Sequence, residues 1–266
     1  MTTPGAGANE RGRIDDLCSE TWDRPDDGSL RARFVIFSAQ RSGSEWLCDY
    51  LRRCGIGIPF EYFNHEHMPT IGGRLGCMLA PRRIDFPRYI ALLDARRARN
   101  GIFGTKLQPD QLRVIFGNDR GGALEMLRRF DRVIFLRRRD RLLQAISLAR
   151  AQLTNQWHLY RDDRTVAVSV PDETLFALID EALAKIGEDD RYMSELVAAL
   201  DPGRVRMLWY EDLADSKACE GVADWVWAVL GGAPRPEVDR SLELPRKLDE
   251  SEARAIEARY LSRGRT

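Results

Sequence analysis

The chain has 266 residues, 44% of them hydrophobic and 31% charged, so it is long enough to form one large domain with a buried core. Lysine plus arginine and aspartate plus glutamate number 41 each, which argues against the basic excess of a nucleic-acid-binding protein. No stretch reaches the roughly 20 apolar residues of a membrane helix, and the five cysteines have neither metal spacing nor the even number of a full disulfide framework, so we expect a cytoplasmic protein.

Strands and helices are expected to alternate along the chain. Residues 1–30 are expected to form a flexible N-terminal tail, and 31–266 a single domain. Apolar runs predict strands at 34–37, 102–107, 131–136 and 205–210. Helical patterns occupy 44–53, 87–99, 109–116, 123–130, a long segment through 151 to about 158, 172–200, 214–230 and 250–261, with a loop at 55–70. This alternation predicts an α/β fold with a parallel central sheet flanked by helices, whose ligands gather at the carboxyl ends of the strands.

The first strand runs directly into the turn Gln40-Arg41-Ser42-Gly43-Ser44, which opens a helix. Small side chains and free backbone N–H groups at a helix N-terminus suit an anion, and Arg41 adds a forked positive charge. The turn lacks both the Walker pattern and the Gly-x-Gly-x-x-Gly pattern, which counts against a kinase or a dehydrogenase. A strand-to-helix turn capped by a serine is the alternative interpretation.

A second cationic segment follows the strand at 131–136. Three adjacent arginines, 137–139, end this strand, and the next helix carries Gln144, Ala145, Ile146 and Ser147. Arginines gathered at the carboxyl end of a strand attract anions, and a solvated basic turn is the alternative. Arg138 and Ser147 are therefore further candidates for the anion site.

Together these segments resemble the bacterial trehalose 2-sulfotransferase family. The resemblance rests on residues 40–44, on Glu61-Tyr62-Phe63, on Gly104-Thr105-Lys106-Leu107 and on Arg138 through Ser147, in this order. It covers about 33–159 and, more loosely, the remainder, where Tyr210-Glu211-Asp212-Leu213 follows a strand. It implies a P-loop-like sulfotransferase fold, 3′-phosphoadenosine 5′-phosphosulfate (PAPS) as donor, and often a homodimer. The implied acceptor is a hydroxylated glycan or glycolipid, and a trehalose-like disaccharide is the first candidate.

The resemblance also implies roles for individual residues. Gln40, Arg41, Ser42, Gly43 and Ser44 would hold the 5′-phosphosulfate, whereas Arg138 and Ser147 would clasp the 3′-phosphate. Glu45 departs from the family, which usually places a second hydroxyl residue there. A carboxylate suits the helix dipole but repels a phosphosulfate, so Glu45 either points away and pairs with an arginine or weakens donor binding.

Sulfuryl transfer requires a base for the acceptor hydroxyl and cations for the leaving phosphate. Glu61 matches the glutamate proposed as general base in the family, and its neighbours Phe60, Tyr62 and Phe63 are expected to raise its pKa by desolvation. Lys106, near a strand end, and Arg41 are expected to neutralise sulfate or phosphate oxygens.

Several side chains and functions stay open at this stage. Trp157, His158 and Tyr160 are candidates for acceptor binding, and Arg246 and Lys247 for further donor contacts. The triplet His65-Glu66-His67 has no third ligand at a recognisable spacing, so no metal is expected. The alternative functions are a nucleotide-dependent phosphotransferase and an inactive protein that binds PAPS or its product 3′,5′-adenosine bisphosphate (PAP).

Overall fold

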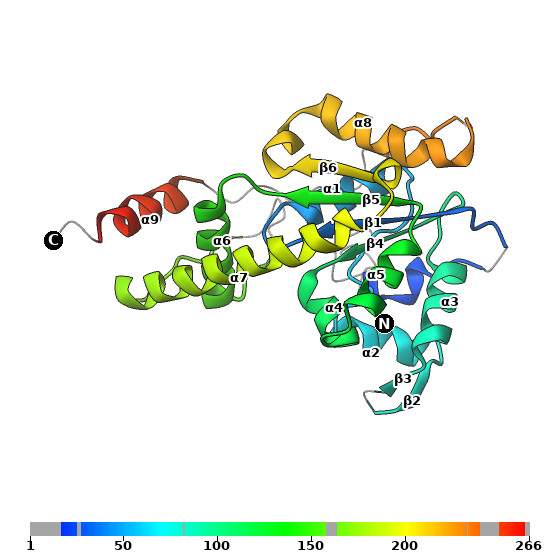
Figure 1. Ribbon diagram of the computed structural model, residues 1–266, viewed down its shortest axis with the longest axis horizontal. Helices are drawn as coiled ribbons and strands as arrows, with labels where there is room; N and C mark the ends of the chain where they lie inside the picture. Colours follow the sequence, from blue (N-terminus) through cyan, green and yellow to red (C-terminus); the bar gives the residue numbers. More distant parts are fainter. Residues whose placement is uncertain are drawn as a thin grey trace, which may run out of the picture.

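A computed structural model shows an α/β domain built on a four-stranded parallel sheet (Figure 1). The sheet order is β4 (Ile102–Leu107), β1 (Ala32–Ser38), β5 (Arg132–Arg137) and β6 (Val205–Trp209). The structure describes residues 17–25, 28–81, 83–157, 164–232, 234–239 and 250–263. Within these ranges, no helix combines the length and the apolar character needed to cross a bilayer. The prediction of a parallel sheet flanked by helices is confirmed.

Helices follow the strands much as the sequence predicts. The described helices are α1 (Ser44–Arg53), α2 (His67–Arg74), α3 (Phe86–Arg96), α4 (Pro109–Phe116), α5 (Arg120–Arg128), α6 (Arg141–Thr154), α7 (Asp172–Ala198), α8 (Ser216–Trp227) and α9 (Glu250–Ser262). The 172–200 pattern forms one continuous helix. Helix α6 stops at Thr154, earlier than expected, because Asn155 takes the left-handed conformation with φ of 52°.

The region expected to be a loop contains additional structure. Helix α2 begins inside it, and an antiparallel pair, β2 (Met78–Ala80) and β3 (Arg83–Ile84), follows. Helix α2 contains one proline and two glycines, which are poor helix formers, but its Ile71 is fully buried. Tertiary packing therefore outweighs the local propensity at this point.

Strand β1 lies in the interior of the sheet, and its side chains alternate between two buried faces. Phe34 and Ile36 belong to the apolar cluster that includes α1 and α8. Val35 and Phe37 belong to a second cluster, formed with α3, α4, α5 and the end of α7. Both faces are thus covered, so the polar residues after β1 are confined to the edge of the sheet.

A third apolar cluster joins α6, the first half of α7 and α9. Figure 1 shows these helices at one end of the molecule, beyond the sheet. Ile256 and Tyr260 of α9 are buried there, and the Tyr260 ring packs edge-on against Phe176 at 5.5 Å between centroids. The end of the chain therefore supports α6, the helix that carries Ser147.

Part of the expected N-terminal tail is packed against the domain. Leu17 is fully buried, and Arg97, at the end of α3, donates a 2.6 Å hydrogen bond from Nη1 to its carbonyl oxygen. Arg97 also binds the Ser19 carbonyl at 2.9 Å and the Asp23 carboxylate at 2.7 Å. Residues 17–25 are therefore held by a buried guanidinium, while residues 1–16 lie outside the described part.

Candidate active site

The turn after β1 has a backbone that few residue types can adopt. Arg41 and Gly43 have φ of 59° and 82°, and the Ser42 hydroxyl donates a 2.7 Å hydrogen bond to the Ala39 carbonyl. A Cβ on Gly43 would come within 2.7 Å of both Leu213 and Tyr210. The turn is therefore wound tightly, and the free N–H groups of the first turn of α1 lie at the carboxyl edge of the sheet.

Arg41, Ser147 and Arg138 meet beside this turn. The Arg41 guanidinium donates from Nε to the Ser147 hydroxyl at 3.0 Å and from Nη1 to the Trp157 carbonyl. Arg138 donates from Nη1 to the Arg41 carbonyl at 3.3 Å, and its guanidinium lies 4.3 Å from the centre of the Tyr210 ring. The structure thus brings together three residues that sequence analysis assigned to one anion site.

Gln40 is fixed from both sides. Its carbonyl accepts a 2.7 Å hydrogen bond from the Gln144 amide of α6, and its own side-chain amide donates to Asp110 at 3.2 Å. Ser44 begins α1 and is buried. All five turn residues are therefore placed around the N-terminus of α1, and Gln144 supports them.

The three adjacent arginines at the end of β5 do not form one anion-binding site. Arg137 pairs with the nearly buried Asp190 at 3.1 Å, and Arg139 pairs with Asp212 at 3.0 Å. Glu211 accepts the backbone N–H of Arg139 at 3.0 Å, which fixes the strand-to-helix turn. The flanking arginines therefore have structural carboxylate partners, and Arg138 is the member that extends to the turn formed by residues 40–44.

Lys106, near the end of β4, lies between two carboxylates. Its ammonium forms ion pairs with Glu45 and, at 2.5 Å, with Glu61. The backbone N–H of Lys106 also binds the Phe60 carbonyl at 3.0 Å, so the segment that carries Glu61 is held against β4. Burial alone would lower the pKa of Lys106, but the two carboxylates outweigh burial and raise it.

Glu61 is surrounded by hydrogen-bond donors. Besides Lys106, its carboxylate accepts from Asn64 and Gln111, each at 2.8 Å, and from Gln108 at 3.4 Å. Burial would raise the pKa of Glu61, but the Lys106 ammonium and the hydrogen bonds from Lys106 and Asn64 lower it to about 2. The expectation of a raised pKa is therefore wrong, because the charge of Lys106 and the hydrogen bonds from Lys106 and Asn64 together outweigh the effect of burial.

Most of the chain matches one known protein family. The family described as Stf0 sulphotransferase matches residues 33–261. The chain belongs to the Stf0 sulphotransferase family. This is the family of the trehalose 2-sulfotransferases, which are PAPS-dependent transferases, and the resemblance drawn from the sequence motifs is confirmed.

Solved structures give a weaker likeness. A sulfotransferase from Alicyclobacillus acidocaldarius is 14% identical, with 90% of this chain and 92% of that one covered and a TM-score of 0.44. The sulfotransferase domain from the curacin biosynthetic pathway is 13% identical over 86% and 97% of the two chains, with a TM-score of 0.41. Retinol dehydratase in complex with androsterone and PAP is 14% identical over 93% and 68%, with a TM-score of 0.36. No curated protein sequence matches the chain.

The residues around the turn at 40–44 fit a polyanionic donor. Arg41 is half-buried, and its two hydrogen-bond acceptors are a neutral hydroxyl and a neutral carbonyl. Burial and the adjacent Arg138 lower the pKa of Arg41 to about 10. Two neighbouring guanidinium groups repel each other, and an anion bound between them and the N-terminus of α1 would relieve this repulsion.

Other candidate residues of the Stf0 chain lie near this site or outside the described part. The His67 ring packs on the Phe60 ring at 4.8 Å between centroids, and its Nδ1 lies 3.6 Å from the Cys18 sulfur. In the part of the chain that the structure describes, no three acidic, histidine or cysteine side chains gather into a metal site. His158, Tyr160, Arg246 and Lys247 lie outside the described residues.

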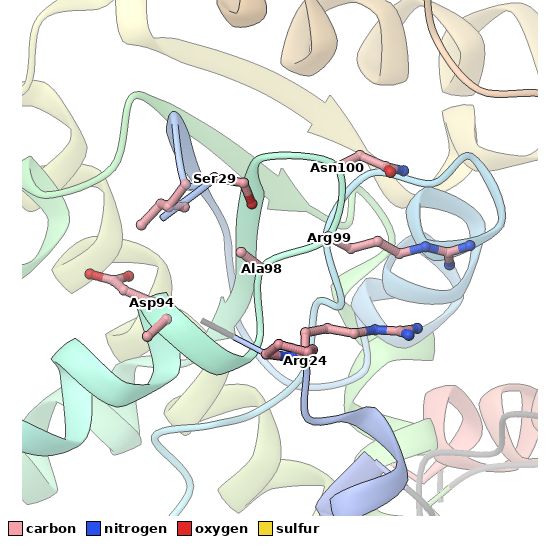
Figure 2. A pocket seen from close by; sticks show the side chains of 9 residues that line it. Arg24, Ser29, Asp94, Ala98, Arg99 and Asn100 are labelled. Atoms are coloured by element: carbon pink, nitrogen blue, oxygen red, sulfur yellow. The ribbon is translucent and has the colours of Figure 1, made fainter. Parts of the chain in front are cut away.

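A separate cavity of about 390 Å³ lies near the starts of β1 and β4, at the opposite edge of the sheet from the turn formed by residues 40–44. Figure 2 shows Arg24, Arg99 and Asn100 of its lining extending toward the same side. Arg99 donates to the Arg52 carbonyl at 3.4 Å and Asn100 to the Gly55 carbonyl at 2.8 Å. These contacts cap the end of α1, so we assign Arg99 and Asn100 a structural role.

Proposed function

We propose that the chain transfers the sulfuryl group of PAPS to a hydroxyl of a carbohydrate or glycolipid, with a trehalose-like disaccharide as the first acceptor to test. The observation that carries this proposal is the meeting of Arg41, Ser147 and Arg138 at the N-terminus of α1. Such a site offers backbone N–H groups to one phosphate and guanidinium groups to another. Family membership supports the reaction class.

In this proposal the two ends of the donor are read by different residues. The turn Gln40 to Ser44 holds the 5′-phosphosulfate with backbone N–H groups and the hydroxyls of Ser42 and Ser44. Arg138 and Ser147 bind the 3′-phosphate, and for this Ser147 would exchange its hydrogen bond with Arg41 for one with the ligand. The Tyr210 ring, stacked on Arg138, limits the positions that this guanidinium can take.

The proposed chemistry uses Glu61 as the base. The Glu61 carboxylate takes the proton of the acceptor hydroxyl, whose oxygen forms a bond to sulfur as the bond between sulfur and the 5′-phosphate oxygen breaks. Lys106 and Arg41 stabilise the negative charge that develops on the leaving PAP. Because the pKa of Glu61 lies near 2, its carboxylate is ionised at neutral pH and able to accept this proton, although it is a weak base.

The acceptor would approach from the side of Glu61. Trp157, whose carbonyl accepts a hydrogen bond from Arg41, and His67, which packs on Phe60, lie next to residues of the proposed chemistry. Aromatic and imidazole rings can stack on sugar faces and bind hydroxyls. These two side chains are therefore our candidates for acceptor contacts.

Transfer of radiolabelled sulfate from PAPS to a panel of disaccharides and glycolipid extracts tests the proposal. We expect label in a carbohydrate product and release of an equal amount of PAP. Transfer of the γ-phosphate of ATP in the presence of magnesium, without sulfate transfer, would instead indicate a phosphotransferase. Tight binding of PAP without transfer to any acceptor would indicate an inactive binding protein.

A further inference from the structure

Glu45 directly follows the turn formed by residues 40–44, and its carboxylate forms an ion pair with Lys106. It lies one residue after Ser44, in the first turn of α1. The alternative that it pairs with an arginine is therefore replaced by a lysine partner from β4. The same ammonium reaches Glu61 on its other side.

These three charges are poorly exposed to water. The side chains of Lys106, Glu45 and Glu61 are 3%, 13% and 14% exposed. One ammonium shared by two carboxylates leaves a local charge of about −1, and solvent screens it weakly at such burial. An anion can therefore bind beside Glu45 only as long as Lys106 neutralises the charge of its carboxylate.

The proposed donor site makes this cancellation necessary. The 5′-phosphate would bind the N–H groups at the start of α1, next to the Glu45 side chain. Glu45 also lies close enough to Arg41 to act on the charge of its guanidinium. An uncompensated carboxylate at this position would repel the phosphate and draw the guanidinium away from it.

We propose that Glu45 and Lys106 act as one neutralised pair beside the donor phosphate, in which Glu45 is a positioning residue for the ammonium and Lys106 cancels the carboxylate that would otherwise oppose donor binding. This inference rests on the proposed PAPS site. It assigns Lys106 a role in the ground state, before any sulfuryl transfer. It also explains how a chain with a glutamate in the first turn of α1 keeps an anion site.

A double-mutant cycle with PAP as the probe, measured by isothermal titration calorimetry, tests the pair. Lys106→Met should weaken PAP binding by about thirtyfold or more, because it removes a cation and also leaves a buried carboxylate without a partner. Glu45→Gln should bind PAP at least as tightly as the wild type. The combined variant should recover about tenfold or more of the affinity that Lys106→Met loses. Glu125→Gln, an exposed change on α5, is the matched control and should behave as the wild type.

If Lys106→Met lowers the PAP affinity by the same factor in the wild type and in Glu45→Gln, the inference is overturned. The charge of Glu45 would then have no effect on donor binding. Because Lys106→Met leaves two buried carboxylates, its fold is checked by circular dichroism, and Glu45→Asp provides a test that keeps the lysine. Glu45→Asp retains the charge but withdraws it from Lys106, so it should bind PAP more weakly than Glu45→Gln, and the reverse order also overturns the inference. Failure of the wild type to bind PAP would reject the proposed function itself.

Discussion

Arg41 and Ser147 are 106 residues apart in the chain, and a 3.0 Å hydrogen bond joins the Nε of the first to the hydroxyl of the second. The bond ties the donor turn after β1 to the second turn of α6. Parallel pairing of β1 with β5 brings these two segments to the same edge of the sheet. The residues proposed for the two phosphates of the donor are therefore in contact, and a substitution at one should alter the position of the other.

Arg138→Ala should weaken PAP binding by about 2 to 4 kcal/mol, because a charge-assisted bond to the 3′-phosphate is lost. Adenosine 5′-phosphate lacks that group, so its affinity should hardly change. Calorimetric titration of both nucleotides measures the difference. Arg139→Ala, which removes an exposed guanidinium paired with Asp212, is the control and should preserve the preference for PAP. Equal losses for the two nucleotides in Arg138→Ala would remove the assignment.

Arg41→Ala should lower the turnover number by about 10², the range found when one preorganised donor to a developing charge is removed. Arg41→Lys should recover only part of the rate, since an ammonium cannot bind Ser147 and a phosphate oxygen with the same fork. Initial rates at saturating PAPS give the comparison. A folded Arg41→Ala enzyme that turns over at the wild-type rate would leave Arg41 with a structural role only.

Glu61→Gln should lower the turnover number by about 10² to 10⁴ while PAP affinity stays near that of the wild type, because the change removes the base and keeps its shape. Asn64 and Gln111 can remain in place around the new amide. Single-turnover sulfate transfer and a PAP titration of the same protein separate the two effects. If the variant sulfates its acceptor at the wild-type rate, the base lies elsewhere, and His65 and His67 are the next to be tested.

The pH dependence of stability should also report on Glu61. Its pKa is lower in the folded chain, about 2, than the ordinary value of 4.5, so ionised Glu61 stabilises the fold above about pH 4.5. This contribution is lost as the pH falls from about 4.5 toward 2. The free energy of unfolding, measured with urea at several pH values, should therefore fall less steeply in this acid range for Glu61→Gln than for the wild type. Parallel curves would show that Glu61 titrates normally.

Gly43→Ala should destabilise the fold by about 1 to 3 kcal/mol, since a side chain at φ of 82° is strained and its Cβ meets Leu213 and Tyr210. Gly187→Ala is the matched control, because this glycine lies within helix α7 and has no atoms within 4 Å of an added Cβ. That change should stabilise the chain by about 0.5 to 1 kcal/mol. Urea unfolding of both variants tests the contrast, and similar values for the two would contradict it.

The strands and the donor turn could be predicted because their signals are local. The apolar run that ends in Phe37 and the Arg-Ser-Gly-Ser turn are contiguous, and β1 and α1 form where this pattern places them. Helix α2 could not be predicted because Pro69, Gly72 and Gly73 disfavour a helix, and the packing of Ile71 and Met68 against distant residues offsets them.

The electrostatics of the site could not be predicted in the same way. Glu61 lies among aromatic residues in sequence, but its charge is set by Lys106, which approaches from a strand 45 positions further along the chain. The partner of Glu45 likewise comes from β4, so no local pattern could identify it. The sequence therefore predicted residues that the structure brings close together, whereas their electrostatic surroundings depend on the order of the strands in the sheet.

That strand order has a consequence for synthesis on the ribosome. Strand β1 has no neighbour in the sheet until β4 has been translated, and its other partner, β5, follows later still. Ser147 lies beyond the midpoint of the 266 residues. Long-range parallel pairing is slow to form, and an apolar strand without partners is prone to aggregate. The nascent chain therefore carries the apolar segment Phe34 to Phe37 without a partner strand until β4 has been translated, and the contact with Ser147 forms later still. We expect the yield to depend on chaperones that shield this segment.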